Sequence, residues 1–226
     1  MDKVEISKLL NGFYGYPKTF VCTSLLAYKE APLENKYYFI KAPKGSRSNT
    51  ISFCRGRQLL IDRGGFKDFP VIIQEEISPK LDDGYKVDYR VWCLVVNKKP
   101  YLYKKCMVKK CDSKFSRQDP EGLFTNGLKN GRTTTLTNTP KDFNPLVFDS
   151  FNLIKHKVPN QSVLGYDIIF DEDGKCWILE IEVRGFGSFN SIALNNRFDE
   201  NFDKKINREL LMLSKGLSSD EFRDIS

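Results

Sequence analysis

Apolar runs along the chain predict a protein built mainly of β-strands. Residues 36–41 and 70–74 combine aromatic and β-branched side chains, a composition typical of strands. The proline, glycine and serines of residues 42–49 end the first of these strands in a loop. The apolar character stops after the second strand. We therefore expect two lobes, residues 1–76 and residues 77–226.

The clearest predicted strand covers residues 87–96. Taken at every second residue, both of its faces are largely apolar, which is typical of a central strand covered on both sides. Asp88 and Arg90 then lie side by side near one end of a buried strand, where a charge must be paired or used. A structural ion pair and a functional role both remain open. Asn97 to Pro100 predicts a turn into a second, lysine-rich arm, residues 101–110.

The remaining pattern predicts one long loop and one helix. The stretch from Cys111 to Pro145 is rich in Asp, Ser, Asn, Gly, Thr and Pro, and we expect a long excursion with little regular structure. Within residues 196–213, apolar residues recur at i,i+4 spacing between charged ones, which predicts an amphipathic helix on the core. Gly216 is expected to end that helix.

An Asp-Gly dipeptide between two apolar alternating runs predicts a β-hairpin over residues 165–182. Such a dipeptide favours a two-residue type I′ turn, because both central residues need a positive φ. With Asp173 and Gly174 in that turn, Phe170 pairs with Trp177. A longer loop would shift this pairing.

The same register brings three carboxylates together. Asp167 lies opposite Glu180, and Glu182 points to the same face as Glu180. Opposed residues have Cβ atoms about 4.5–5.5 Å apart, so like charges there are destabilising unless cations offset them. A hard divalent ion with oxygen ligands, above all Mg²⁺, meets this need. Neutralisation by Lys or Arg side chains without metal is the alternative.

Length and composition exclude several classes of protein. The 226 residues suffice for one large domain or two small lobes, and 40% hydrophobic residues make a globular composition. No apolar run approaches the roughly 20 residues that a membrane-spanning helix needs, and the start of the chain shows no signal-peptide pattern. We expect a cytoplasmic protein with no membrane partner.

Charge and rare residues narrow the chemistry further. The 36 Lys and Arg exceed the 29 Asp and Glu by 7, which favours acidic partners. The single histidine, His156, excludes a multi-histidine metal site, and it is expected to be a surface residue. Six scattered cysteines without a Cys-x-x-Cys pair are expected to be free thiols. Chemistry must therefore rest on carboxylates, lysines and arginines.

Two motifs resemble the tubulin tyrosine ligase-like branch of the ATP-grasp superfamily. The first is the strand Lys86-Val87-Asp88-Tyr89-Arg90, and the second is the hairpin from Gly165 and Asp167 through Trp177 and Glu180 to Glu182. Three further matches follow the family's order: Tyr16-Pro17-Lys18-Thr19-Phe20, Phe39-Ile40-Lys41 and Leu136-Thr137-Asn138. The resemblance covers residues 14 to 215, and the ordered combination is more specific than any one motif.

The resemblance implies a fold and a reaction. The fold is α+β, an ATP-grasp fold in which two lobes with mostly antiparallel sheets hold ATP between them. The reaction is ATP-dependent amide-bond formation, in which ATP phosphorylates a protein or peptide carboxylate and an amino acid attacks the acyl phosphate. Implied partners are ATP, Mg²⁺, an amino acid and an acidic protein or peptide acceptor, with tubulin one possible acceptor.

The resemblance also implies roles for individual residues. Arg90 and Lys109 would orient the carboxylate substrate or its acyl phosphate. Asp167, Glu180 and Glu182 would hold magnesium. Residues near the nucleotide would be Lys41, Gln74, Glu75, Ile77, Lys86, Asp88, Thr137 and Asn138.

Three features depart from the family pattern and keep alternatives open. Glu182 replaces the usual Asn, residues 183–188 lack the usual continuation, and the loop of residues 44–49 has a single glycine. A non-catalytic ATP-grasp module that binds nucleotide or protein is therefore the main alternative. Nucleic-acid binding by the lysines from Lys98 to Lys114 is a weaker one, since such a run is more often a solvated strand face.

Overall fold

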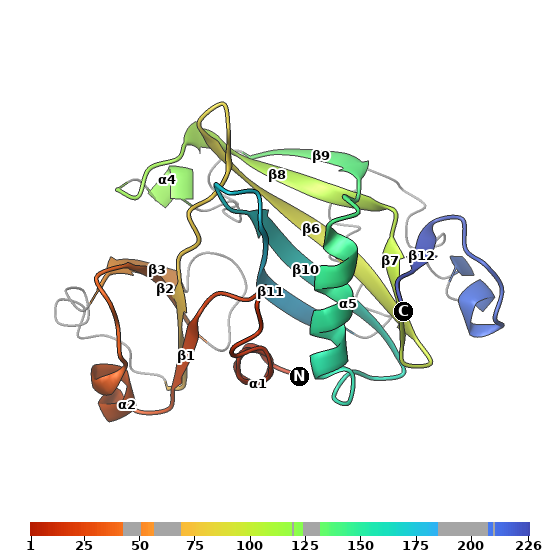
Figure 1. Cartoon of the computed structure of the whole chain (residues 1–226), viewed down its shortest axis with the longest axis horizontal. Helices are drawn as coiled ribbons and strands as arrows, with labels where there is room; N and C mark the ends of the chain where they lie inside the picture. The colour runs from red at the N-terminus through yellow and green to blue at the C-terminus, as the bar shows by residue number, and fades with distance from the viewer. Residues whose placement is uncertain (43–50, 57–68, 119, 124–131, 185–207, 210) are drawn as a thin grey trace.

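The computed structural model describes residues 1–42, 51–56, 69–118, 120–123, 132–184, 208–209 and 211–226 (Figure 1). Two antiparallel β-sheets dominate these residues, and a few helices pack against them. This mixture of helices and antiparallel sheets agrees with the expected α+β class.

The first sheet has four strands in the order β1-β4-β2-β3. The strands are β1 (Thr19–Cys22), β2 (Tyr37–Lys41), β3 (Ile51–Arg55) and β4 (Val71–Glu75). Alternate residues of β2, Tyr38 and Ile40, are buried in a small core, to which helix α2 (Leu25–Glu30) contributes Tyr28. Because side chains alternate along a strand, Lys41 lies on the opposite face of β2.

The second sheet contains eight strands among the described residues, and its main path runs β11-β10-β6-β7-β12. Strand β5 pairs with β6, and β8 pairs with both β6 and β9. The bounds are β5 (Leu81–Asp82), β6 (Tyr85–Val96), β7 (Lys99–Tyr103), β8 (Lys105–Lys114), β9 (Arg132–Asn138), β10 (Gln161–Phe170), β11 (Cys176–Arg184) and β12 (Phe222–Asp224).

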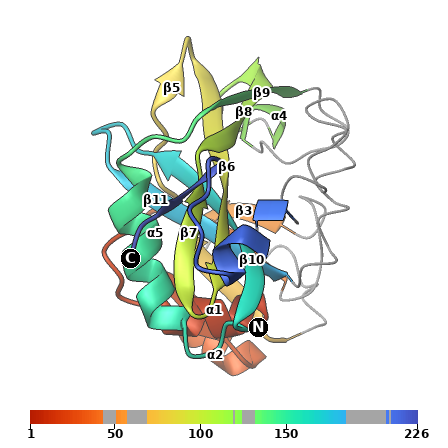
Figure 2. The same cartoon turned by 90° about the vertical axis from the view of Figure 1, so that its right-hand side faces the viewer.

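Strand β6 is the central strand that its sequence predicted. Every residue from Val91 to Val96 is buried, and the two faces belong to different hydrophobic clusters, one containing Val91 and the other Trp92. Helix α5 (Phe143–Ile154) covers one face of the sheet, and helix α1 (Lys3–Leu9) lies between α5 and the first sheet (Figure 1). Figure 2 shows α5 along one side of the same sheet and strand β12 near the C-terminus.

The predicted turn after β6 is confirmed, but the second arm is divided. Asn97 and Lys98 both have positive φ, 52° and 62°, and form the two-residue turn. Beyond it, β7 and β8 both pair with β6, with a break at Lys104. Lys104 donates its backbone N–H to the carbonyl of Glu221 instead.

The expectation of an irregular excursion from Cys111 to Pro145 is wrong. Strand β8 continues to Lys114, a short helix α4 (Pro120–Leu123) follows, and β9 pairs with β8 over its whole length. The error has a physical reason. The threonines of β9 have high β-propensity, but the surrounding Asn, Gly and Pro residues hide this signal in a composition count.

The carboxylate hairpin forms with a different turn from the one expected. Phe170 pairs with Cys176 rather than with Trp177. The carboxylate of Asp171 accepts hydrogen bonds from the backbone N–H groups of Asp173 and Lys175 at 3.1 and 2.8 Å, and this stabilises a longer turn in which Gly174 has a φ of 83°. The prediction of a two-residue turn was therefore wrong.

A bulge restores the register that matters for the carboxylates. The pairing shifts by one residue between Asp167 and Ile168, because Leu179 is an extra residue on β11. Asp167 therefore does lie opposite Glu180, as predicted. The longer turn and the bulge displace the register in opposite directions, so their effects cancel at this pair.

The helix predicted within residues 196–213 lies mostly outside the described residues. Its described part, 208–209 and 211–214, is helical. Gly216 ends it as predicted, with a φ of 74° and with the N–H groups of Gly216 and Leu217 bonded to the carbonyls of Leu213 and Met212. None of the helices in the described part of the chain has the length and apolar character to cross a membrane. The six cysteines are free thiols, and His156 is exposed.

Candidate functional site

A buried charge cluster joins β6, β8 and β10. The Nζ atom of Lys109 lies 2.8 Å from Oδ1 of Asp88 and 2.9 Å from Oδ1 of Asp167. The strand registers produce this grouping, because Lys109 is the partner of Asp88 and Asp167 is the partner of Arg90. All three side chains are at most 4% exposed, so the cluster is shielded from water.

The cluster shifts the titration of its members. Burial raises the pKa of Asp88, although Lys109 opposes the shift. Burial also acts to raise the pKa of Asp167, but Arg90 and Lys109 outweigh it and the pKa falls below its usual value. Burial acts to lower the pKa of Lys109, and the two carboxylates reverse this. Lys109 is therefore held as a cation by its two neighbours.

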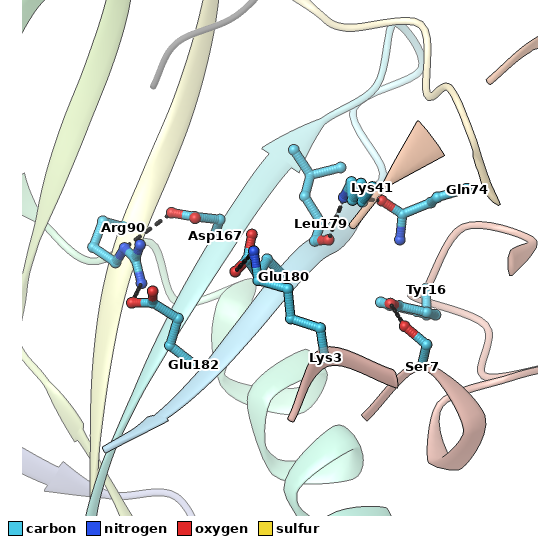
Figure 3. Close-up of polar contacts among 10 residues, drawn as sticks. All are labelled: Lys3, Ser7, Tyr16, Lys41, Gln74, Arg90, Asp167, Leu179, Glu180 and Glu182. Atoms are coloured by element: carbon cyan, nitrogen blue, oxygen red, sulfur yellow. Dashed lines mark hydrogen bonds and ion pairs between the residues drawn. The ribbon is translucent and has the colours of Figure 1, made fainter. Parts of the chain in front are cut away.

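Arg90 connects this cluster to the outer carboxylates. Its Nε atom is 3.0 Å from Asp167 and its Nη1 atom donates to Glu182 at 2.9 Å (Figure 3). Gly165, the residue opposite Glu182, allows this path across the sheet. A Cβ atom on Gly165 would lie 2.5 Å from Nη1 of Arg90, so the first glycine of the hairpin motif has a steric role here.

Glu180 and Lys41 line the same small hollow where the two sheets come together. Glu180 forms an ion pair with Lys3 of α1 at 3.1 Å. Lys41, from the first sheet, donates to the carbonyl of Leu179, the bulged residue of β11, at 3.3 Å. Figure 3 shows the Lys41 amine at the carbonyl of Leu179 and the Glu180 carboxylate at the Lys3 amine.

Lys41 is also held from its own sheet. Its Nζ atom donates to Oε1 of Gln74 at 2.5 Å, and the Nε2 atom of Gln74 lies 3.5 Å from the hydroxyl of Thr19. Gln74 is 1% exposed. Its buried side chain thus holds the Lys41 ammonium group.

Lys41 leads to a pH-dependent prediction. Burial lowers the pKa of Lys41 from the usual 10.5 to about 8, although Glu180 opposes this shift. Between these values the unfolded chain keeps a proton that the folded protein has lost, so Lys41 makes the free energy of unfolding rise with pH over this window. We expect Lys41→Met to remove that rise, as measured by urea unfolding from neutral to alkaline pH. Parallel curves for the two proteins would contradict the assignment.

The other predicted nucleotide residues are spread along the boundary and beyond it. Lys86 is buried, donates to the carbonyl of Leu123 at 2.8 Å and lies 5.5 Å from the ring centroid of Phe39. Burial lowers the pKa of Lys86. Glu75 forms a 2.8 Å ion pair with Lys36. Ile77 is half-buried in the segment between the sheets.

Thr137 and Asn138 lie apart from these residues. Both are exposed on β9 and pair with Cys106 and Lys105 of β8. Strands β8 and β6 separate β9 from β10, which carries Asp167. The structure thus does not bring these two residues to the carboxylates.

Sequence reasoning missed two residues that the fold brings to the boundary. Lys3 is one. The other is Arg117, whose Nε atom donates to both carboxylate oxygens of Glu76 at 3.1 and 2.9 Å, and whose Nη2 atom donates to Ser78 at 2.9 Å. Its guanidinium lies 5.1 Å from the ring centroid of Tyr37 in the first sheet. Neither residue belongs to a local motif, so only the contacts reveal them.

Two motif residues have a visible structural task. Nε1 of Trp177 donates to Oδ2 of Asp171 at 2.7 Å. The same carboxylate accepts the turn N–H groups of Asp173 and Lys175, so Asp171 and Trp177 together stabilise the turn. Two lysines of the run from Lys98 to Lys114 also form hydrogen bonds within the protein. Lys98 donates to the carbonyls of Lys155 and Val158, and Lys104 donates to that of Asp220.

The candidate metal ligands are paired with cations in this structure. Asp167, Glu180 and Glu182 bind Lys109, Lys3 and Arg90. Over the residues that the structure describes, no three His, Cys, Asp or Glu side chains are grouped as metal ligands. Neutralisation by Lys and Arg is thus the arrangement observed here, while the side chains remain the oxygen donors that Mg²⁺ prefers.

Comparison with protein families identifies the chain's relatives. The model of the tubulin-tyrosine ligase family matches residues 6–139, more than half of the chain. The chain belongs to the tubulin-tyrosine ligase family. No curated protein matches it. Members of the family are ligase-type enzymes that typically use ATP and Mg²⁺. The match includes Lys41, Asp88, Arg90 and Lys109 and ends before the carboxylate hairpin.

Proposed function

We propose that the protein is an ATP-dependent ligase with an ATP-grasp fold that joins an amino acid to a carboxylate of a protein or peptide. One observation carries this proposal: Lys41 of the first sheet lies against the carboxylate hairpin of the second, 3.3 Å from the carbonyl of Leu179. A nucleotide between two lobes needs cations on one side and metal-binding carboxylates on the other. Residues 1–76 and 77–226 would be these lobes.

The charged groups of the boundary suit phosphoryl transfer. This reaction needs positioned cations on the phosphate oxygens more than it needs a covalent nucleophile. Lys41 and Lys86 are ammonium groups with lowered pKa values, and phosphate oxygens would favour their charged form. Half-buried Phe39 lies on β2 two residues before Lys41, with its ring centroid 5.5 Å from Nζ of Lys86, and offers an aromatic surface at the same boundary.

The acidic residues suit magnesium in their chemistry. Asp167 and Glu180 are cross-strand neighbours with oxygen donors on one face, and Glu182 continues that face. These three side chains would hold Mg²⁺, and the ion would supply positive charge to offset that of the phosphate groups. Asp88 would act through Lys109, which it contacts at 2.8 Å.

Arg90 is our candidate for orienting the acceptor carboxylate or its acyl phosphate. Its planar guanidinium can bind carboxylate or phosphate oxygens in two places, and it is already held by Asp167 and Glu182. Lys109 is too deeply buried, at 3% exposure, to touch a substrate without rearrangement. We assign it to holding Asp88 and Asp167 in place. The acidic acceptor, tubulin or another protein, would complement the excess of positive charge.

The proposal predicts the behaviour of a Glu180→Gln variant. ADP release from magnesium-ATP with candidate amino acids and acceptors should fall by at least about a hundredfold, because a charged ligand is lost where charge develops. Glu172→Gln, at an exposed position in the turn of the same hairpin, is the matched control and should keep full activity. Equal ADP release by the two variants would remove Glu180 from the mechanism.

Mass spectrometry of a cell extract incubated with the protein and magnesium-ATP would identify the modified acceptor. A mass shift that needs both ATP and Glu180 would give the amino acid added and the residue that carries it. Such an experiment requires no prior choice of acceptor.

A non-catalytic nucleotide-binding module is the second candidate. It is favoured by the ion pairs that occupy all three carboxylates and by Glu182, which adds a negative charge where the family pattern has Asn. Calorimetry that records magnesium-dependent ATP binding, together with no ADP release under any condition, would support this function over ligation.

A further inference from the structure

Helix α1 contributes a cation to the candidate site. Lys3, in its first turn, lies 3.1 Å from Oε1 of Glu180 on β11 (Figure 3). Hydrogen bonds on both sides of Lys3 in the sequence hold this helix in place. The Asp2 carboxylate accepts the N–H of Glu5 at 2.8 Å as an N-cap, and the hydroxyl of Ser7 is hydrogen-bonded to that of Tyr16 at 3.0 Å.

Lys3 and Lys41 flank the same carboxylate from two different elements. Both line a small hollow between α1, the first sheet and β11, together with Ser7, Tyr16 and Glu180. Lys41 donates to Gln74 and Leu179, whereas Lys3 forms the ion pair with Glu180. Lys3 is therefore the counter-ion of Glu180 in this structure.

The Lys3 pair differs from the buried pair at the centre of the site. The side chains of Lys3 and Glu180 are 25% and 19% exposed, whereas those of Lys109 and Asp167 are 3% and 4% exposed. A partly exposed pair is weak, and water can solvate both ions when it opens. Opening the buried pair would leave charges without water. Another cation can thus replace Lys3 at Glu180 at little cost in free energy. Replacing Lys109 at Asp167 would cost far more.

We propose that Lys3 is an internal competitor of the divalent cation at Glu180. In the nucleotide-free protein its ammonium group neutralises Glu180, and the metal-nucleotide complex displaces it on binding. Helix α1 thereby raises the Mg²⁺ concentration at which the site is filled. This inference rests on the proposed function, because it requires Glu180 to be a metal ligand.

The test compares Lys3→Gln with Lys8→Gln in the full chain. Lys8 lies on the same helix, is exposed, and loses the same charge. Calorimetric titration of ATP at a series of Mg²⁺ concentrations gives the midpoint of the magnesium dependence of binding, independently of turnover. We expect Lys3→Gln to lower this midpoint about two- to fivefold, the range for an ion pair of this exposure, and Lys8→Gln to leave it unchanged.

A charge-conserving variant and a fold measurement complete the design. Lys3→Arg should keep the midpoint of the unmodified protein, and circular dichroism of each variant checks that α1 and the sheets are formed. An unchanged or raised midpoint in Lys3→Gln would overturn the competitor role while leaving the proposed function intact. If no form of the protein binds ATP in a magnesium-dependent way, the proposed function itself fails.

Discussion

Replacing Lys109 with methionine is expected to destabilise the protein by about 3–5 kcal/mol, because it leaves two buried carboxylates without their cation. Asp88 and Asp167 each lie within 2.9 Å of the Lys109 ammonium, and burial already raises the pKa of Asp88. Methionine matches the length of the lysine stem but cannot offset their charge. Urea unfolding at neutral pH measures the loss.

The neighbouring lysine is a control for this variant. Lys110 has the opposite orientation on β8 and pairs with Asp82, a side chain that is 62% exposed, at 2.6 Å. Solvent screens such a pair, so Lys110→Met should change stability far less. Similar losses of stability in the two variants would show that burial does not increase the contribution of the Lys109 ion pairs.

Gly165→Ala is the second substitution with a large expected effect. The new Cβ would meet Nη1 of Arg90 at 2.5 Å, so the guanidinium must shift, and this disturbs its contacts with Asp167 and Glu182. We expect a loss of about 1–3 kcal/mol, as for overpacking in a buried site. ADP release in the proposed reaction should fall as well, since Arg90 is the candidate that orients the acceptor.

A double-mutant cycle separates this clash from a general effect on β10. In an Arg90→Ala background the space that Cβ needs is free, so adding Gly165→Ala should cost little further stability. The coupling free energy between positions 90 and 165 is the difference between the stability costs of Gly165→Ala in the two backgrounds. Equal costs in both backgrounds would contradict the steric role of Gly165.

Several features of this protein follow from local sequence alone. The alternation along residues 87–96 predicted a strand covered on both faces, and Val91 to Val96 are buried in two clusters. The period-two rule also put Glu180 and Glu182 on one face. Both conclusions need only the geometry of a strand, which does not depend on distant residues.

Turns were less predictable because side chains several residues away select them. The sequence contains Asp-Gly at two hairpins, and only Asp83-Gly84 forms the two-residue turn, with φ values of 52° and 84°. At Asp173-Gly174 the carboxylate of Asp171 captures two backbone N–H groups and lengthens the loop. The pairing of Asp167 with Glu180 survived only because of the bulge at Leu179.

By itself, the sequence determined the types of residue available for chemistry, their order along the chain, and the strands that carry them. Which cation meets which carboxylate was decided by the tertiary structure. Lys109 reaches Asp88 and Asp167 through the registers of three strands, and Lys3 reaches Glu180 from a helix 177 positions away in the sequence. Coulomb interactions depend on distance in space, and that distance is set by packing.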